Sequence, residues 1–259
     1  MATPTPLFSS LPLKKDGPRG NAWGLFGDKD ELGMLNRLTA ETTLAATKEI
    51  IYGVRIATDW SMAMPKVPCF GRQAFHQQIF HKAPRTVNDD ILTLNTQSST
   101  QWDGFRHCGY QDHKIFFNGC TQSEILSSTK NGTHVWVENG GIVGRGVLLD
   151  YAAWAKSQGQ MPSPRSTTEI TVSDLESIAN AQNVRFAPGD ILFIHTGFVS
   201  EFTALSEEAA SAYAANLAPP AIGLASECAR LKKWTFFFSS VPLNVPGGVA
   251  SPPNGVAIL

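Results

Sequence analysis

Two short apolar segments in the second half of the chain constrain its fold more than any other feature. Residues 191–197 (ILFIHTG) follow a Pro-Gly-Asp turn, and residues 234–240 have the sequence WTFFFSS. Short apolar runs bounded by turn signals predict buried strands. Between them, an alanine-rich stretch from about Ser206 to Leu217 predicts a helix, which Pro219 and Pro220 end.

Two further helices and two extended segments are expected earlier in the chain. Thr39 is placed to cap a helix that continues to Ile51, and the spacing of Ser173 and Glu176 predicts a capping box at the start of another. Extended segments are expected at 54–63 and 91–103. Strands and helices mix without a regular strand–helix–strand period, which favours an α+β fold over a doubly wound parallel sheet.

The composition indicates one folded domain with no affinity for nucleic acid. Of the 259 residues, 42% are hydrophobic and 17% are charged, which is typical of a globular chain. Residues 1–22 are expected to form an N-terminal arm, and residues 23–259 a single domain. The net charge of −1 provides no basic surface that would attract nucleic acid.

The targeting features lead us to expect a cytoplasmic protein. The sequence has no apolar run of the roughly 18 residues that a bilayer requires, and its first residues lack the basic start of a secretory signal. The four cysteines have no Cys-x-x-Cys spacing, so we expect free thiols in a reducing compartment.

The segment 91–113 concentrates polar side chains that can support chemistry. In an extended conformation, Gln97, Gln101 and Asp103 project from the same face, because side chains alternate along a strand. His107 follows four residues after the aspartate. Burying such groups without partners costs on the order of 2 kcal/mol each. The cluster therefore either serves a ligand or ion in a cleft or belongs to a solvated strand face.

Motifs along most of the chain resemble the cyclase family, whose best-known members are bacterial kynurenine formamidases and isatin hydrolases. The family motif His-x-x-x-His-x-Asp-x-x-x-His aligns with residues 97–107. The resemblance continues in Trp23-Gly24, 32–36 (LGMLN), 141–150 (GIVGRGVLLD) and 189–197 (GDILFIHTG), and the tail 242–254 resembles the fungal branch. It implies a single-domain fold of the swivelling β/β/α type, with a β-rich core flanked by helices.

The resemblance also assigns roles to residues of the motif. Asp103 stands at the family's metal-ligand aspartate, and His107 at the histidine that serves catalysis or a second metal. Gln97 and Gln101 replace the two metal-binding histidines and are expected to form hydrogen bonds with substrate. Amide oxygens are weak ligands for the zinc or manganese of the family. The candidate metal ligands are therefore Asp103 and Gln101, with no tetrahedral zinc expected and the absence of any metal an alternative.

Three other residues are considered for the pocket. Trp102 and Tyr110, within and after the motif, are predicted to contact substrate. His195 lies in a predicted buried strand, at a position where relatives often have an arginine that faces the cleft. The favoured interpretation of His195 is a hydrogen-bonded core histidine.

The carboxyl-terminal region departs from the family. Relatives carry a segment with the glutamate that completes the metal site, and this chain lacks it near residues 226–227. Glu227 is not expected to replace that glutamate, because it lies in helical sequence that matches the family's sequence after the missing segment. The resemblance further implies a homodimer or a higher homo-oligomer.

Together these features predict an enzyme that hydrolyses an amide or lactone bond of a small aromatic or polyketide-like molecule, as arylformamidases do. His107 is expected to act as general acid or base, because histidine ionises near neutrality. One alternative is a metal-independent cyclase, dehydratase or isomerase of secondary metabolism. Another is a binding protein that has lost catalysis.

Overall fold

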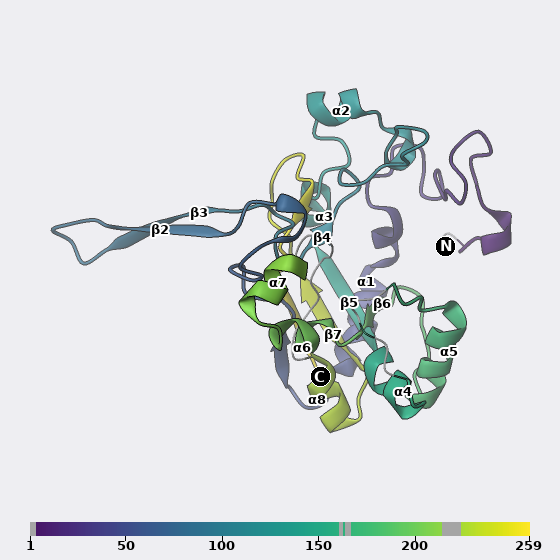
Figure 1. Cartoon of the computed structure of the whole chain (residues 1–259). Coiled ribbons are helices and arrows are strands. Elements are labelled where there is room, and N and C mark those ends of the chain that lie inside the picture. Colours follow the sequence, from purple (N-terminus) through teal and green to yellow (C-terminus); the bar gives the residue numbers. More distant parts are fainter. Residues whose placement is uncertain (1–3, 161–162, 164–166, 214–223) are drawn as a thin grey trace.

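Five strands form the central sheet of this computed structural model, which describes residues 4–160, 163, 167–213 and 224–259 (Figure 1). In spatial order they are β1 (Arg55–Ala57), β9 (Gly255–Ile258), β7 (Thr235–Ser240), β5 (Ile142–Leu149) and β6 (Ile191–Ile194). β5 and β6 are parallel, and the other neighbouring strands are antiparallel. The parallel pairing brings the residues that follow β5 and β6 to the same end of the sheet.

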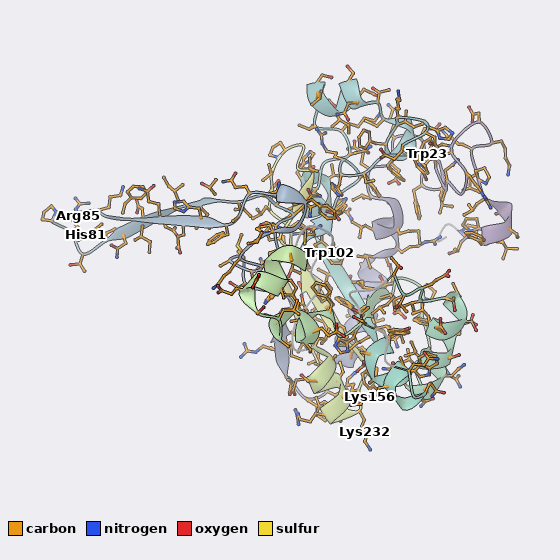
Figure 2. The ribbon with its side chains drawn as sticks, in the orientation of Figure 1. Trp23, His81, Arg85, Trp102, Lys156 and Lys232 are labelled. Carbon is orange, nitrogen blue, oxygen red and sulfur yellow. The ribbon has the colours of Figure 1, made fainter. Side chains whose placement is uncertain are left out.

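Two smaller sheets extend this framework. β2 (His76–His81) and β3 (Asn88–Thr93) form an antiparallel hairpin that projects from the body, with His81 and Arg85 near its far end (Figure 2). β4 (Trp102–Asp103) pairs with β8 (Ala250–Ser251). This second pairing fixes the polar motif against the carboxyl-terminal tail.

Short helices surround the sheet. The α-helices of the described residues are α1 (Ala40–Ala46), α2 (Gln122–Ser127), α3 (His134–Glu138), α4 (Tyr151–Ser157), α5 (Val172–Ala181), α6 (Phe198–Thr203), α7 (Glu207–Tyr213) and α8 (Leu224–Leu231). The 3-10 helices are η1 (Phe8–Ser10), η2 (Gly33–Arg37), η3 (Thr47–Glu49), η4 (Cys69–Gly71) and η5 (Phe117–Gly119). No helix in these ranges has the length and hydrophobicity that crossing a bilayer requires.

Both faces of β5 are buried, each against different helices. Val147 and Leu149 pack with residues of α4 and α5. Leu148, on the alternate face, packs with Phe236 and Phe238 of β7 and with α8. At Gly146 the ring of Phe236 lies so close to the backbone that a Cβ atom would overlap it. The sheet therefore holds β5 rigidly in the core, and the residue that follows it is well placed.

The α+β class and the single domain predicted from the sequence are confirmed, as are the strands near 191 and 234. The predicted helix starts after Thr39 as expected, but α1 ends at Ala46 and η3 follows it. The predicted capping box of α5 was wrong by two residues. Thr171 caps the helix and pairs with Asp174, because this earlier pair has the same spacing and meets the helix first.

Two other expectations need correction. Residues 91–103 do not form one strand, since β3 ends at Thr93 and a turn follows. β6 is only half-buried, because it lies at the edge of the sheet. The alanine-rich helix begins at Glu207, and its predicted end, with Pro219 and Pro220, lies outside the described residues. The four cysteines are free thiols, as predicted.

Candidate active site

A turn before β4, rather than strand alternation, brings the motif side chains together. The side-chain oxygen of Asn95 accepts a hydrogen bond from the Gln97 N–H at 2.9 Å, and the Asn95 carbonyl accepts one from Ser98 at 2.9 Å. Arg72 donates to the Gln97 carbonyl at 2.9 Å. These contacts hold Gln97 buried beneath the turn, with its side chain directed at the start of β4.

Gln97, Gln101 and Asp103 meet and form what we call the amide–carboxylate cluster. The Gln97 side-chain amide donates to Oδ1 of Asp103 at 2.9 Å, and the Gln101 amide donates to both oxygens of Asp103 at 3.2 Å. The carboxylate thereby fixes both amide orientations, because only the N–H side of an amide can face it. As a result, Oε1 of Gln101 is buried and has no hydrogen-bond partner among the described residues.

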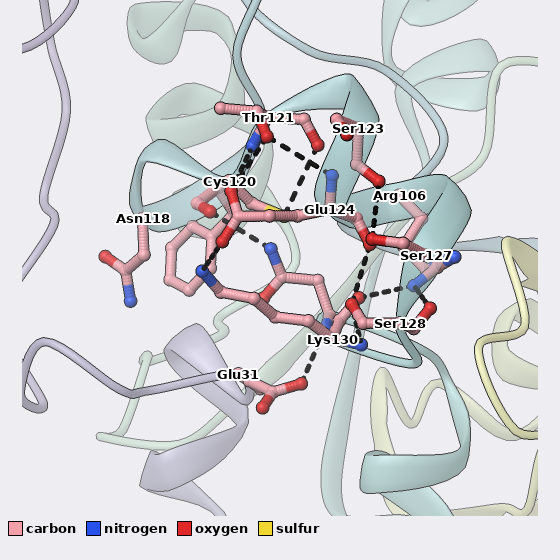
Figure 3. A network of polar contacts seen from close by, with 12 residues as sticks. Glu31, Arg106, Asn118, Cys120, Thr121, Ser123, Glu124, Ser127, Ser128 and Lys130 are labelled. Atoms are coloured by element: carbon pink, nitrogen blue, oxygen red, sulfur yellow. Dashed lines mark hydrogen bonds and ion pairs between the residues drawn. The ribbon is translucent and has the colours of Figure 1, made fainter.

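His107 lies in the turn that follows β4. The residue is half-buried, its backbone N–H donates to the Gly104 carbonyl at 3.0 Å, and within the described ranges no hydrogen bond or ion pair joins its ring to the cluster. The neighbouring Arg106 anchors this turn, donating to the carbonyls of Ser128 at 3.1 Å and Lys130 at 2.6 Å (Figure 3). The motif residues thus share a rigid segment, but only three of the predicted four are in mutual contact.

A cavity of about 510 Å³ opens beside Gln101 and Trp102, on the face of the sheet that α8 covers. The Trp102 indole is fixed there by a 2.9 Å hydrogen bond to the Ser240 hydroxyl of β7. The other aromatic side chains of the wall are Phe193, Phe198 and Phe238, and its hydroxyl groups are those of Thr58, Thr100, Thr196, Ser200 and Ser226. Such a mainly apolar wall with a few polar groups is typical of a small-molecule site.

Asp150 and His195 line the same cavity and are in contact, with Nδ1 of the imidazole 2.8 Å from Oδ1 of the carboxylate. Asp150 directly follows β5 and His195 directly follows β6, so the two parallel strands present them at the same end. His195 is hydrogen-bonded, as expected, but it belongs to a cavity wall and not to the core, with 33% of its side chain exposed. The sequence signal for the pair was a polar residue at the end of each of two apolar strands, which is where open sheets bind ligands.

Tyr110 lies away from this cavity, in a separate hollow that Trp23 and Phe117 also line. The ring of Tyr110 packs edge-on against Trp23, with 5.6 Å between the ring centroids. Of the four residues predicted to contact substrate, Gln101 and Trp102 line the main cavity. Gln97 lies beneath the turn and is not among the lining residues, and Tyr110 lines the separate hollow.

The amide–carboxylate cluster does not fit a divalent transition metal. Two amide groups direct their N–H donors at Asp103, so its carboxylate already interacts with hydrogen-bond donors in the place where a cation would need free oxygens. No group of three or more histidine, cysteine or acidic side chains that could hold a metal occurs among the described residues. Glu227 forms an ion pair with Arg230 within α8, at 2.7 Å.

The fold is similar to those of solved structures described as a cyclase and as isatin hydrolases. A crystal structure described as a novel cyclase has a TM-score of 0.79 and 24% identity, over 92% of this chain and 99% of that chain. An isatin hydrolase bound to the product analogue thioisatinate has a TM-score of 0.50 and 11% identity, over 85% and 99%. Isatin hydrolase A from Labrenzia aggregata, bound to benzyl benzoate, has a TM-score of 0.50 and 12% identity, over 79% and 93%. At these identities, the likeness establishes the fold.

A search of curated proteins found no match. The comparison with family models agrees with the structural comparison. A family model with the description "Putative cyclase" matches residues 38–232, which include β4, the cluster and both strands that carry Asp150 and His195. This chain belongs to the cyclase family.

Proposed function

We propose that this protein is a hydrolase-type enzyme that takes a small, largely apolar molecule into the cavity beside Trp102 and cleaves an amide bond in it. The observation that carries the proposal is that the amide–carboxylate cluster meets the cavity at Gln101 in a cyclase-family fold. The cavity has the volume of a small-molecule site. Its aromatic side chains favour a substrate with an aromatic ring, because stacked and edge-on rings attract one another.

The buried oxygen of Gln101 favours an amide over a lactone. A buried acceptor without a donor costs about 1–3 kcal/mol. Gln101 lines the cavity, so a turn of its side chain on substrate binding would let this oxygen accept a substrate N–H and would remove that cost. A lactone has an oxygen in place of this N–H and leaves the acceptor unsatisfied. Sites built to hydrogen-bond a substrate N–H reject analogues that lack it.

The test is a matched panel of aryl formamides and aryl lactones of the same size, assayed with the full chain. We expect formamides to be hydrolysed with kcat/KM at least about 10-fold above the lactones, which corresponds to about 1.4 kcal/mol. Gln101→Leu should remove the preference for formamides over lactones, while its thermal midpoint stays close to that of the parent. Binding of panel members without turnover of any would contradict the hydrolase proposal and favour a binding protein. Products of unchanged mass would favour a metal-independent cyclase or isomerase.

His107 has a separate test, because its acid–base role is supported by the family motif alone. If His107 transfers a proton, His107→Ala should lower kcat by about 100-fold or more, the usual scale for losing a general acid or base. The thermal midpoint should change little, since His107 is only half-buried. Full activity in this variant would remove His107 from the mechanism and leave the proposed hydrolysis standing.

A further inference from the structure

We propose that Asp150 and His195 form an acid–base pair in the cavity wall, in which Nε2 of His195 exchanges protons with the substrate and its attacking water. The inference rests on the proposed function, because it names the proton-transfer group for hydrolysis in the same cavity. It comes from the contact between the two side chains and from their place among the lining residues.

The contact with Asp150 fixes which imidazole nitrogen is free. Nδ1 lies 2.8 Å from a carboxylate oxygen whose side chain is only 8% exposed. A carboxylate can only accept, so Nδ1 carries the hydrogen and Nε2 keeps a lone pair in the neutral ring. Within the described ranges Nε2 has no hydrogen-bond partner, and a third of the His195 side chain is open to the cavity. Nε2 is therefore available to accept a proton.

Asp150 is itself held in place by three elements. Its Oδ1 accepts a second hydrogen bond from the Ala153 N–H at 2.9 Å, which caps α4. Its own backbone N–H donates to Gln182 at the end of α5 at 2.9 Å, and Gln182 also donates to the Leu148 carbonyl of β5 at 3.1 Å. The carboxylate is thus oriented before any substrate arrives, as electrostatic catalysis requires.

The backbone of His195 is equally constrained. Its N–H donates to the Leu149 carbonyl at 2.9 Å, and its carbonyl accepts from Ala152 at 3.0 Å. Asp150 and His195 are also the only ionisable side chains among the described residues that line the cavity. Within this lining, His195 is therefore the side chain that is placed to exchange a proton with a bound substrate.

The proton transfers balance for hydrolysis. Nε2 removes a proton from water while the water oxygen bonds to the carbonyl carbon of the substrate. When the carbon–nitrogen bond breaks, the departing nitrogen takes that proton from Nε2, which returns the imidazole to its neutral form. Asp150 remains a carboxylate and stabilises the transient imidazolium, so the net change is addition of water across the amide bond.

The kinetic test compares His195→Gln and Asp150→Asn in the full chain. Asparagine caps helices as well as aspartate does, so Asp150→Asn keeps the cap of α4 and removes only the charge. We expect kcat to fall at least about 100-fold in His195→Gln, with a smaller change in KM. Asp150→Asn should also lower kcat, while both thermal midpoints stay close to that of the parent. His81→Gln is the matched control, because it removes an exposed histidine at the far end of the hairpin (Figure 2).

A second measurement needs no substrate. Two-bond nitrogen–proton NMR spectra of the uniformly labelled protein report which imidazole nitrogen carries the hydrogen, and His195→Gln identifies the His195 signals. We expect hydrogen on Nδ1 of neutral His195. The preference should be weaker in Asp150→Asn, because the neutral amide oxygen that keeps the cap accepts from Nδ1 less strongly than a carboxylate does.

The two measurements separate the two proposals. Parent-like kcat in His195→Gln, or a neutral His195 with hydrogen on Nε2, would overturn the acid–base pair while leaving amide hydrolysis in place. An inactive parent protein would refute the hydrolase proposal, and the NMR result would still decide whether the pair has the geometry claimed for it.

Discussion

At the scale of single residues, the Asp103 carboxylate receives hydrogen bonds from two neighbouring amides. In the family motif that residues 97–107 resemble, histidines stand at these two positions. Relative to that motif, the two substitutions place donors to an anion where a cation would have its ligands. The local geometry nevertheless keeps Gln97 and Gln101 directed at the same carboxylate. Reversing the two substitutions should therefore recreate a metal site.

We expect the double variant Gln97→His, Gln101→His to bind zinc more tightly than the parent chain, because imidazole is a far better ligand than an amide. Titration with zinc, followed by calorimetry and by thermal midpoint, measures this. The variant should gain a midpoint shift with zinc that the parent lacks. Stoichiometric zinc in the purified parent protein would show that the amides do not exclude the metal.

Residue patterns located the amide–carboxylate cluster but not the cavity pair. Gln97, Gln101 and Asp103 could be found because the motif holds them within seven positions, although a turn and not strand alternation brings them together. Asp150 and His195 are 45 positions apart, and their contact depends on which strands become neighbours. An apolar run containing one histidine is equally compatible with a core and with a cavity wall, so the sequence could not separate the two.

At the scale of elements, sequence reasoning located the two apolar strands better than the helix boundaries, whereas the segment 91–103 is not one strand. The two apolar segments became β6 and β7, because hydrophobic burial in a sheet depends on the whole segment. The start of a helix depends on a single capping hydrogen bond. Two overlapping residue pairs near the start of α5, Thr171–Asp174 and Ser173–Glu176, have the spacing of a capping box. The Thr171 side chain accepts from the Asp174 N–H, and Asp174 accepts from the Thr171 N–H at 2.8 Å.

This capping box can be tested against the pair that the sequence first suggested. Thr171→Ala should lower the free energy of unfolding by about 1 kcal/mol, the usual cost of losing an N-cap side chain. Ser173→Ala should change it by less than about 0.5 kcal/mol, because Ser173 is an exposed residue within the first turn. Urea unfolding of both variants provides the comparison, and an equal cost for the two would contradict the observed cap.

At the scale of the whole molecule, Glu49 links elements that are distant in sequence. From η3 it accepts hydrogen bonds from Arg145 of β5 at 2.8 Å, from Lys233 at 2.7 Å and from the Thr235 hydroxyl of β7 at 2.6 Å. Burial alone would raise the pKa of Glu49, but Lys233, Thr235 and Arg145 together hold it below its usual value of 4.5. A depressed carboxyl pKa stabilises the fold above the unfolded pKa, and that stability is lost as the pH falls through the folded pKa.

Glu49→Gln should therefore lower the free energy of unfolding by about 2 kcal/mol at pH 7, the scale of hydrogen bonds to a charged group. The difference from the parent should narrow as the pH falls from the unfolded pKa of about 4.5 through the lower folded pKa, because Glu49 of the folded parent becomes neutral only there. Denaturant unfolding at several pH values measures this, with the exposed Glu176→Gln on α5 as control. A difference that does not depend on pH would mean that Glu49 acts through packing and not through its charge.

Other properties of the whole molecule stay predictions. Five expectations rest on the sequence alone: the cytoplasmic location, the homodimer, the resemblance to the fungal branch, the separate arm over residues 1–22 and the missing segment near residues 226–227. Contacts within one copy of this protein do not test them, because they concern its place in the cell, a second chain or the sequences of relatives.

The place of β6 in the sheet also has a consequence for how the protein keeps its chemistry. β6 is an edge strand and pairs with β5 alone, so β5, β7 and β9 can stay assembled without it. β6 is also only half-buried, so its pairing gains less burial than the pairing of the inner strands and is lost more easily. Asp150 and His195 meet only while β6 is paired with β5. The chain can therefore hold much of its core while the proton-transfer pair is apart, and we expect it to lose chemical competence before its core unfolds.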